Sequence, residues 1–494
     1  MRSNHTTLLL TLLFVIAEFN IVIAQPKRPN ILFIAVDDLR PFDLPSYGNP
    51  VIKSPAINLL ASQGFVFNNQ YVAVPTCGAS RCSMITGMYP KTREHLSNEA
   101  SVLTISNKPK TEVPETFIDN LRRNGYYTVG IGKISHSADG YVYPYSSSKS
   151  NLLEWPYSWD EMLFDAGKWG TGWNAFFGYS DYSNRNAQKN MVKPYEIGEV
   201  HDEGYPDGLT ANLAIKKLNE LGRKEEPFFL AVGFFKPHLP FNAPKKYWDL
   251  YDESNIQLTP APSIPKNINF ASLNESSEFN GYKLGEEKAT FENPLSDSYA
   301  RKIRHAYYAS VSYTDTQIGK LLTALSESGL DKNTIVVLWS DHGWHLGDNS
   351  IWGKHTLFDW ALKNVFILKV PGMKGGKGIN QITSAVDIYP SLMELCNVKM
   401  PHKTDGKSFV PLLLRNNKKN KSENVAYGYY NNGITMRTDR YRLTKYFRKK
   451  EPLVELYDHI KDPYENENIA SKNPKLVNTL MRLLDNANID LYKK

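Results

Sequence analysis

The chain has 494 residues, of which 41% are hydrophobic and 12% aromatic, so it can bury a large core and is not a disordered chain. Its three cysteines exclude a disulfide-built scaffold and a cysteine-rich zinc module. The formal net charge of +7 is spread along the chain and forms no basic stripe, which argues against nucleic acid as a partner.

The first 24 residues have the pattern of an export signal. Arg2 precedes an apolar run from Leu8 to Ala17, and Ala24 suits cleavage. Because the run is short and is followed by Glu18 and Asn20, it would span a membrane poorly. We expect an exported protein, periplasmic or secreted, without stable membrane insertion. A hydrophobic N-terminal anchor is the alternative.

Four short apolar runs predict buried parallel strands. They are Asn30–Val36, Tyr127–Gly132, Pro227–Gly233 and Thr334–Ser340. Helical spacing occurs between them, at Ser54–Gly64, Glu115–Asn124, Leu209–Leu221 and Arg301–Ser328. Strands that alternate with helices predict an α/β fold with a large, mostly parallel sheet flanked by helices.

The C-terminal part of the chain has a different pattern. Short aromatic and β-branched runs between Asn424 and Leu443 surround turn signals, and a strand at Leu453–Tyr457 and a helix at Lys475–Asn486 follow. We expect a catalytic domain over residues 25–400 and a smaller α+β subdomain with an antiparallel sheet over 401–494. The polar stretch from Thr259 to Asp297 predicts a long surface excursion.

Ionisable residues follow each of the four predicted strands. They are Asp37 and Asp38, then Lys133 and His136, then Lys236 and His238, then Asp341 and His342. Ligands of such sheets bind at the carboxyl ends of the strands. The carboxylates favour Ca²⁺ or Mg²⁺, and the Lys and His side chains would surround an anion beside the cation. The alternatives are a turn at the aspartates and solvated lysines.

The segment from Val74 to Gly87 contains a candidate nucleophile. Cys77 would lie at a turn before a helix, where N–H groups and Arg81 lower the pKa of a thiol and hold an anion. A plain cysteine nucleophile usually needs a histidine base, which this segment lacks. From this segment alone, a buried and inert cysteine is an equal alternative.

These residues carry a resemblance to a family. Cys77-Gly78-Ala79-Ser80-Arg81, followed by Thr86-Gly87, resembles the sulfatase signature C-x-P/A-x-R…T-G. Further sulfatase-like elements extend along nearly the whole chain, namely Val36–Pro41, Gly132-Lys133 with His136, Ser340–Gly343, Trp352–His355, and Glu455–Asp458 with Asp462, Pro463 and Glu465. Gly233–His238 and the Asp341-His342 pair resemble the iduronate-2-sulfatase-like branch of the type I, formylglycine-dependent sulfatases.

The resemblance implies a fold, an activity and a set of roles. The fold would be alkaline-phosphatase-like, and the enzyme would be a sulfuric ester hydrolase. A maturase would oxidise Cys77 to formylglycine, whose hydrate attacks the sulfur. The implied Ca²⁺ ligands are Asp37, Asp38, residue 77, Asp341 and His342. The implied catalytic residues are Cys77, Arg81, Lys133 and His136, with His136 as the base, and the implied sulfate-binding residues are Lys236, His238 and Lys354.

Two features depart from the pattern or leave alternatives open. Position 79 is Ala where the aerobic maturation signal usually has Pro. Conversion of Cys77 would leave Cys82 and Cys396, for which a disulfide is one option and separate buried thiols are another.

The implied substrate is a sulfated polysaccharide or its oligosaccharides. A 2-O-sulfated uronic acid or related sugar, from a glycosaminoglycan or an algal polysaccharide such as ulvan, is the main expectation, with specificity in the loops Tyr141–His201 and Pro240–Tyr299. The Lys- and Asn-rich chain favours a microbial exported enzyme over an animal lysosomal one. The alternatives are a phosphonate or phosphate ester hydrolase of the same superfamily and an inactive sulfated-glycan-binding homologue.

Overall fold

The computed structural model describes residues 28–146, 150–414, 425–487 and 489–492. The export signal expected at residues 1–24 lies outside these described residues. Within them, no helix combines the length and the apolar character that crossing a membrane requires.

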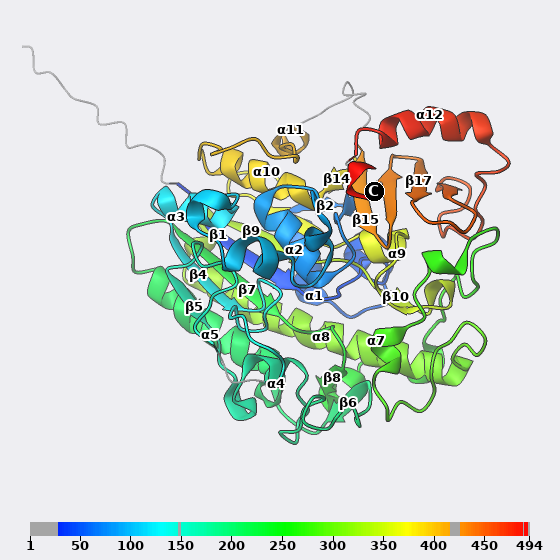
Figure 1. Cartoon of the computed structure of the whole chain (residues 1–494). Coiled ribbons are helices and arrows are strands. Elements are labelled where there is room, and N and C mark those ends of the chain that lie inside the picture. Colours follow the sequence, from blue (N-terminus) through cyan, green and yellow to red (C-terminus); the bar gives the residue numbers. More distant parts are fainter. Residues whose placement is uncertain (1–27, 147–149, 415–424, 488, 493–494) are drawn as a thin grey trace, which may run out of the picture.

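An eight-stranded sheet forms the centre of the molecule, in the order β13-β2-β12-β9-β1-β7-β4-β5 (Figure 1). Its strands are β1 Asn30–Val36, β2 Phe65–Phe67, β4 Tyr127–Gly132, β5 Glu161–Leu163, β7 Phe228–Phe234, β9 Thr334–Ser340, β12 Phe366–Lys369 and β13 Lys377–Ile379. Strand β12 is antiparallel to β2 and β9, and the other pairs are parallel. The expected mostly parallel sheet is therefore confirmed, with one reversed strand.

The four strands predicted from the sequence are neighbours in the middle of this sheet, in the order β9-β1-β7-β4. The last residue of β1, Val36, is aligned with Phe234 of β7 and Ser340 of β9. Gly132 of β4 is aligned with Gly233 of β7. Because the four strands are parallel and in register, the residues that follow them leave the sheet at one edge.

Helices cover both faces of the sheet (Figure 1). They are α1 Pro55–Gln63, α2 Cys77–Thr86, α3 Phe117–Arg123, α5 Pro206–Leu221, α8 Asp297–Glu327 and α10 Ile388–Leu395. Phe33 points to the face covered by α2, α3 and α10, whereas Leu32 and Ile34 point to the face covered by α1, α5 and α8. This burial on both faces explains why β1 is apolar throughout.

Two predicted helices begin earlier in the structure than the hydrophobic pattern indicated. Helix α5 begins at Pro206, because proline suits the first helical turn, where its missing N–H is not needed. Helix α8 begins at Asp297, after Ser296, whose side chain accepts a hydrogen bond from the N–H of Tyr299.

The C-terminal part is an antiparallel sheet with one helix packed on it, as expected. Its elements are β15 Ala426–Tyr430, β16 Gly433–Arg437, β17 Tyr441–Tyr446, β18 Val454–Asp458 and α12 Pro474–Leu484. Met436 and Leu443 share one apolar core with the Phe33 face of the large sheet. The subdomain is therefore packed against the main domain, while the boundary at residue 400 stays a prediction.

Short strands and short α-helices lie between these elements. They are β3 Gln70–Tyr71, β6 Tyr195–Gly198, β8 Phe241–Pro244, β10 His345–Leu346, β11 Trp352–Gly353, β14 Thr383–Ser384, α4 Gly172–Phe176, α6 Lys245–Trp248, α7 Ser277–Asn280, α9 Asp359–Leu362 and α11 Val410–Leu413. The expected surface excursion at Thr259–Asp297 is wrong for its centre, because Phe279 and Tyr282 are buried. Their apolar surface packs this segment onto the main domain.

Candidate active site

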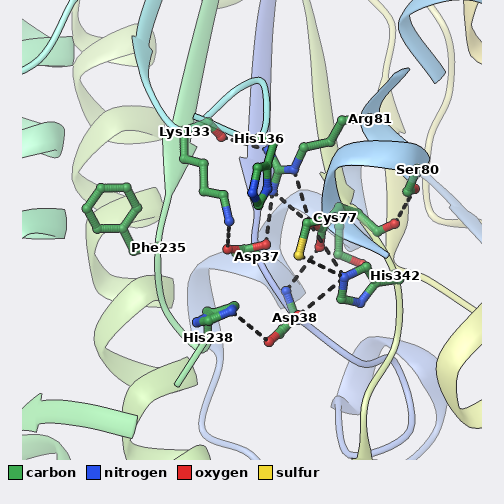
Figure 2. A network of polar contacts seen from close by, with 12 residues as sticks. Asp37, Asp38, Cys77, Ser80, Arg81, Lys133, His136, Phe235, His238 and His342 are labelled. Atoms are coloured by element: carbon green, nitrogen blue, oxygen red, sulfur yellow. Dashed lines mark hydrogen bonds and ion pairs between the residues drawn. The ribbon is translucent and has the colours of Figure 1, made fainter. Parts of the chain in front are cut away.

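Cys77 is the first residue of α2 and lies in the centre of the polar network (Figure 2). The following residue, Gly78, donates its N–H to Asn98 Oδ1 over 3.0 Å. A Cβ at position 78 would lie 2.1 Å from the backbone oxygen of Asn98, so only glycine allows this close approach. The residue pattern around Cys77 thus reflects tight packing at the start of the helix.

Arg81, one turn further along α2, ties the helix to three strand ends. Its Nη2 donates to Asp37 Oδ1 over 3.2 Å and to Asp341 Oδ2 over 3.0 Å. Its Nη1 donates to the carbonyls of Lys133 and Ile134 over 2.8 and 3.0 Å. The side chain is fully buried, so these contacts hold it in one orientation.

The predicted metal ligands converge. The carboxylates of Asp37 and Asp38, Cys77 Sγ and a ring nitrogen of His342 all lie within 4.8 Å of one another. Asp341 lies beside them, since its Oδ1 accepts the N–H of Asp38 over 3.1 Å. Clustered carboxylate oxygens fit a hard divalent cation such as Ca²⁺, although His342 is a softer donor.

The two adjacent aspartates differ in their electrostatic environment. Burial acts to raise the pKa of Asp37, but Lys133 and Arg81 hold it well below its ordinary value. For Asp38 burial outweighs the attraction of Lys354, and its pKa rises to about 7. Asp38 is therefore a buried carboxylate that the protein's own cations compensate only in part, which also fits a cation ligand.

His342 presents a ring nitrogen to this cluster. Its Nδ1 lies 2.9 Å from the carbonyl of Gly343, an acceptor, so we assign the proton to Nδ1. Its Nε2 lies 3.2 Å from Cys77 Sγ and 3.4 Å from Asp38 Oδ1. The lone pair of Nε2 is thus directed into the cluster, as a metal ligand requires.

Two of the predicted lysines also point into the site. Lys354 Nζ donates to both oxygens of Asp38 over 2.8 and 3.1 Å and lies 3.4 Å from Cys77 Sγ. Lys133 pairs with Asp37, and its ammonium lies 4.2 Å from the ring centre of Phe176. Both ammonium groups are therefore fixed next to the carboxylates and near residue 77.

Lys236 is buried but is oriented differently. Its ammonium donates to the carbonyls of His238 and Pro240 over 3.0 and 2.6 Å. Burial lowers its pKa to about 8. These contacts fix the turn that carries His238, whereas the predicted contact of Lys236 with sulfate stays a prediction.

His136 lies beside Trp173, with 5.5 Å between the ring centres. Burial, assisted by Lys133, holds its pKa well below the ordinary value, so the ring is neutral. Among the described residues, its buried Nδ1 has no hydrogen-bond partner. A neutral ring with an unpaired nitrogen is compatible with the predicted role as a base.

The structure adds Glu278 of α7, which the sequence reasoning missed. Its Oε1 lies 2.9 Å from His238 Nε2, and its Oε2 lies 3.4 Å from Lys354 Nζ. In the sequence Glu278 is one of several acidic residues in a polar stretch, and no local motif separates it from the others.

An aromatic wall borders the site, and we define it as Tyr145, Trp173, Phe176 and Phe177. The ring of Tyr145 lies 4.5 Å from that of Trp173, and Phe176 lies 4.5 Å from His238. Tyr145 is 45% exposed, so this wall reaches the surface. All four residues come from the loop region in which we expect substrate specificity.

The three cysteines are unpaired and buried. The possible disulfide between Cys82 and Cys396 is therefore absent, and burial raises the pKa of Cys82 to about 11. Burial also raises the pKa of Cys77 well above its ordinary value in spite of Lys354. An unmodified Cys77 is thus a poor nucleophile at neutral pH.

The chain is similar to known proteins along most of its length. A family model described as sulfatase matches residues 29–398, and one described as N-sulphoglucosamine sulphohydrolase, C-terminal, matches residues 347–489. Iduronate 2-sulfatase of Mus musculus is 31% identical over 419 residues, which are 77% of this chain and 71% of the relative. A sulfatase of Formosa agariphila is 30% identical over 488 residues, or 94% and 88%.

The fold is also that of solved structures. A protein solved with its substrate D-glucosamine-2-N,6-O-disulfate superimposes with a TM-score of 0.70, at 20% identity, over 94% of this chain and 98% of that protein. The likeness confirms the expected sulfatase-type α/β architecture.

Proposed function

Because this chain belongs to the type I sulfatase family, in its iduronate-2-sulfatase-like branch, and is a sulfuric ester hydrolase, we propose that it cleaves a sulfated carbohydrate with formylglycine formed from Cys77. The observation that carries the proposal is the position of Cys77, whose Sγ lies 3.4 Å from Lys354 Nζ and 3.2 Å from His342 Nε2. The raised pKa of this thiol argues against a plain cysteine nucleophile. Addition of water to the formylglycine aldehyde would give a hydrate, and a hydroxyl of this hydrate would supply an oxygen nucleophile at the same place.

One Ca²⁺ is the proposed cofactor. Asp37, Asp38, Asp341 and His342, together with residue 77, would hold it. Such a cation acts as a Lewis acid and as a template for the reacting group. Arg81 keeps Asp37 and Asp341 oriented for this task through the contacts described above.

The remaining residues of the site would bind the ester or transfer protons. Lys133 and Lys354, which flank Cys77 and the aspartates, would bind sulfate oxygens and stabilise the charge that develops in the transition state. His238 lies 3.8 Å from Asp38 and would donate a proton to the departing alcohol. His136, whose Nδ1 has no hydrogen-bond partner in the described part of the chain, would accept a proton from the remaining hydroxyl of the formylglycine hydrate. Loss of that proton would release sulfate from residue 77.

We propose a 2-O-sulfated uronic acid or a related unit of a sulfated polysaccharide as the substrate. The name of the mouse relative supports this class. The exposed ring of Tyr145, at the edge of the aromatic wall, supports a sugar ring at the site, because aromatic faces stack on the apolar faces of sugars. We also propose export through the N-terminal segment and a formylglycine-generating maturase as a partner.

Replacement of Cys77 tests the proposal directly. We expect Cys77→Ala to lower turnover of an aryl sulfate by at least about a thousandfold, because it removes the nucleophile and not merely an assisting group. The melting temperature should change little. Mass spectrometry of the peptide that spans residue 77 should show the mass of formylglycine in the active wild-type enzyme.

Cys82→Ala is the matched control, since Cys82 is also buried in α2 and should leave most activity intact. A fully active wild-type enzyme with an intact Cys77 thiol would refute the proposal that formylglycine at residue 77 provides the nucleophile. Faster cleavage of aryl phosphonates than of aryl sulfates by fully modified enzyme would favour the phosphonate hydrolase alternative.

A further inference from the structure

The proposed reaction assigns no role to Glu278, although its carboxylate lies in the site. Its backbone is held firmly by the residues around it. Ser276, with a φ of 55°, accepts the N–H of Trp352 on its Oγ over 2.9 Å. The Asn280 side chain donates to the carbonyl of Ala289 and accepts its N–H, over 2.7 and 2.9 Å. The position of Glu278 is therefore built into the fold.

The carboxylate of Glu278 contacts two of the predicted sulfate-binding residues, His238 and Lys354. It lies 2.9 Å from His238 Nε2 and 3.4 Å from Lys354 Nζ, and its side chain is 20% exposed. Lys354 Nζ is in turn 3.4 Å from Cys77 Sγ. The Lys354 ammonium group thus contacts both Glu278 and the residue that would carry the nucleophile.

Glu278 places a negative charge beside Lys354 and His238, which would contact the anionic ester in the proposed function. Burial acts to raise its pKa, but Lys354 and His238 hold it well below the ordinary value, so the carboxylate is ionised. A nearby fixed charge in a partly buried site interacts strongly with each charge of a ligand. A sulfate monoester carries one negative charge, whereas a phosphate monoester carries nearly two above pH 7.

We propose that Glu278 is a specificity-determining residue that admits an ester group with one negative charge and disfavours a group with two. It acts by direct repulsion and by engaging His238 and Lys354, which would otherwise be free to attract a second charge. The inference rests on the proposed function in placing the ester group at residue 77.

The test compares esters with the same leaving group and different charge. They are para-nitrophenyl sulfate and para-nitrophenyl methylphosphonate, each with one negative charge, and para-nitrophenyl phosphate, with two at pH 8. The readout is kcat/KM for each ester, or its affinity by calorimetry where turnover is undetectable. Ratios between esters remove any general loss of activity that the substitution causes.

For Glu278→Gln we expect the phosphate-to-methylphosphonate ratio to rise by about tenfold over wild type, because one repulsive charge is removed. Glu278→Asp keeps the charge and should stay within about twofold of the wild-type ratio. Glu275→Gln is the matched control, because it removes an exposed charge three positions away and should leave the ratio unchanged.

An unchanged ratio in folded Glu278→Gln, or the same rise in Glu275→Gln, would overturn the inference. Failure of the proposed function has a different signature. Fully modified wild-type enzyme would then show negligible sulfate turnover, while the phosphate-to-methylphosphonate ratio would still report on Glu278.

Discussion

At the scale of single residues, the buried guanidinium of Arg81 holds several parts of the site in place. It neutralises Asp37 and Asp341 and also binds the carbonyls of Lys133 and Ile134. A planar fork with several donors meets these directions at once, whereas a lysine ammonium is a compact point charge. Arg81 therefore determines the positions of Asp37 and Asp341, and it also fixes the start of α2.

Arg81→Lys should lower both stability and activity. We expect the free energy of unfolding to fall by about 3–5 kcal/mol, because the compact ammonium of lysine cannot contact both Asp37 and Asp341 and leaves one buried carboxylate without its partner. Aryl sulfate turnover should fall by at least about a hundredfold. Urea denaturation and steady-state kinetics measure the two effects. Arg122→Lys, at a pair with Asp160 where the arginine side chain is 42% exposed, is the control and should change neither. Wild-type stability of Arg81→Lys would contradict this account.

At the scale of elements, the start of α2 and the ends of the strands make one unit. Helix α2 begins at Cys77 because Asn98 packs on the backbone of Gly78 and accepts its N–H. From this helix the Arg81 side chain reaches the residues that follow β1, β4 and β9. The residues of the signature around Cys77 therefore anchor helix α2, in addition to their role in the proposed chemistry.

Gly78→Ala tests this anchoring. The added methyl would lie 2.1 Å from the Asn98 backbone oxygen, so the start of α2 must shift. We expect a loss of about 1–3 kcal/mol in unfolding free energy, the usual cost of overpacking, and a clear loss of turnover. Gly222→Ala is the control, since its Cβ would meet the end of the flexible Leu330 side chain at 3.0 Å. Equal stability and activity of the two variants would show that α2 tolerates the shift.

At the scale of the whole molecule, a buried ionic cluster joins the main domain to the C-terminal subdomain. Asp359 of α9 accepts the Tyr71 hydroxyl over 2.9 Å and pairs with Arg437 of β16 over 3.4 Å. Its own N–H donates to Glu465 over 3.0 Å. His459 lies 3.0 Å from Glu465. Because the cluster spans both parts, the two should unfold together.

The cluster makes stability dependent on pH. Burial acts to raise the pKa of Asp359, but His459 and Arg437 hold it below its ordinary value. A depressed carboxylate contributes stability above its unfolded pKa of about 4, and this contribution is lost as the pH falls further. Asp359→Asn should therefore cost about 3 kcal/mol at pH 7, and the difference from wild type should shrink below about pH 4.

Urea denaturation between pH 7 and pH 3 measures this difference. The exposed Asp249→Asn, which changes a surface pair with Lys245, should follow the wild-type curve throughout. A difference between Asp359→Asn and wild type that stays constant with pH would show that the carboxylate charge is not what joins the domains.

The predictable part of the site comes from residues adjacent to strong local patterns. Asp37 and Asp341 follow β1 and β9, and the structure places their side chains on the same arginine. Glu278 was not predictable, because its segment has no periodic pattern and its position depends on packing against Trp352. The orientation of Lys236 was not predictable either, since a sequence shows that a lysine follows a strand but not which acceptors its ammonium meets.

The sequence by itself determined which buried strands are followed by the ionisable residues of the candidate site. Buried apolar runs form parallel strands, and parallel strands bring the residues after them to one edge, so local pattern sufficed to bring Asp37, Lys133 and Asp341 together. Cys77 was identified from the sulfatase-like signature around it. Only the tertiary structure decided what surrounds them. The aromatic wall, the turn held by Lys236 and the approach of Glu278 to Lys354 depend on contacts between distant segments, whose geometry arises from packing and has no signature in local sequence.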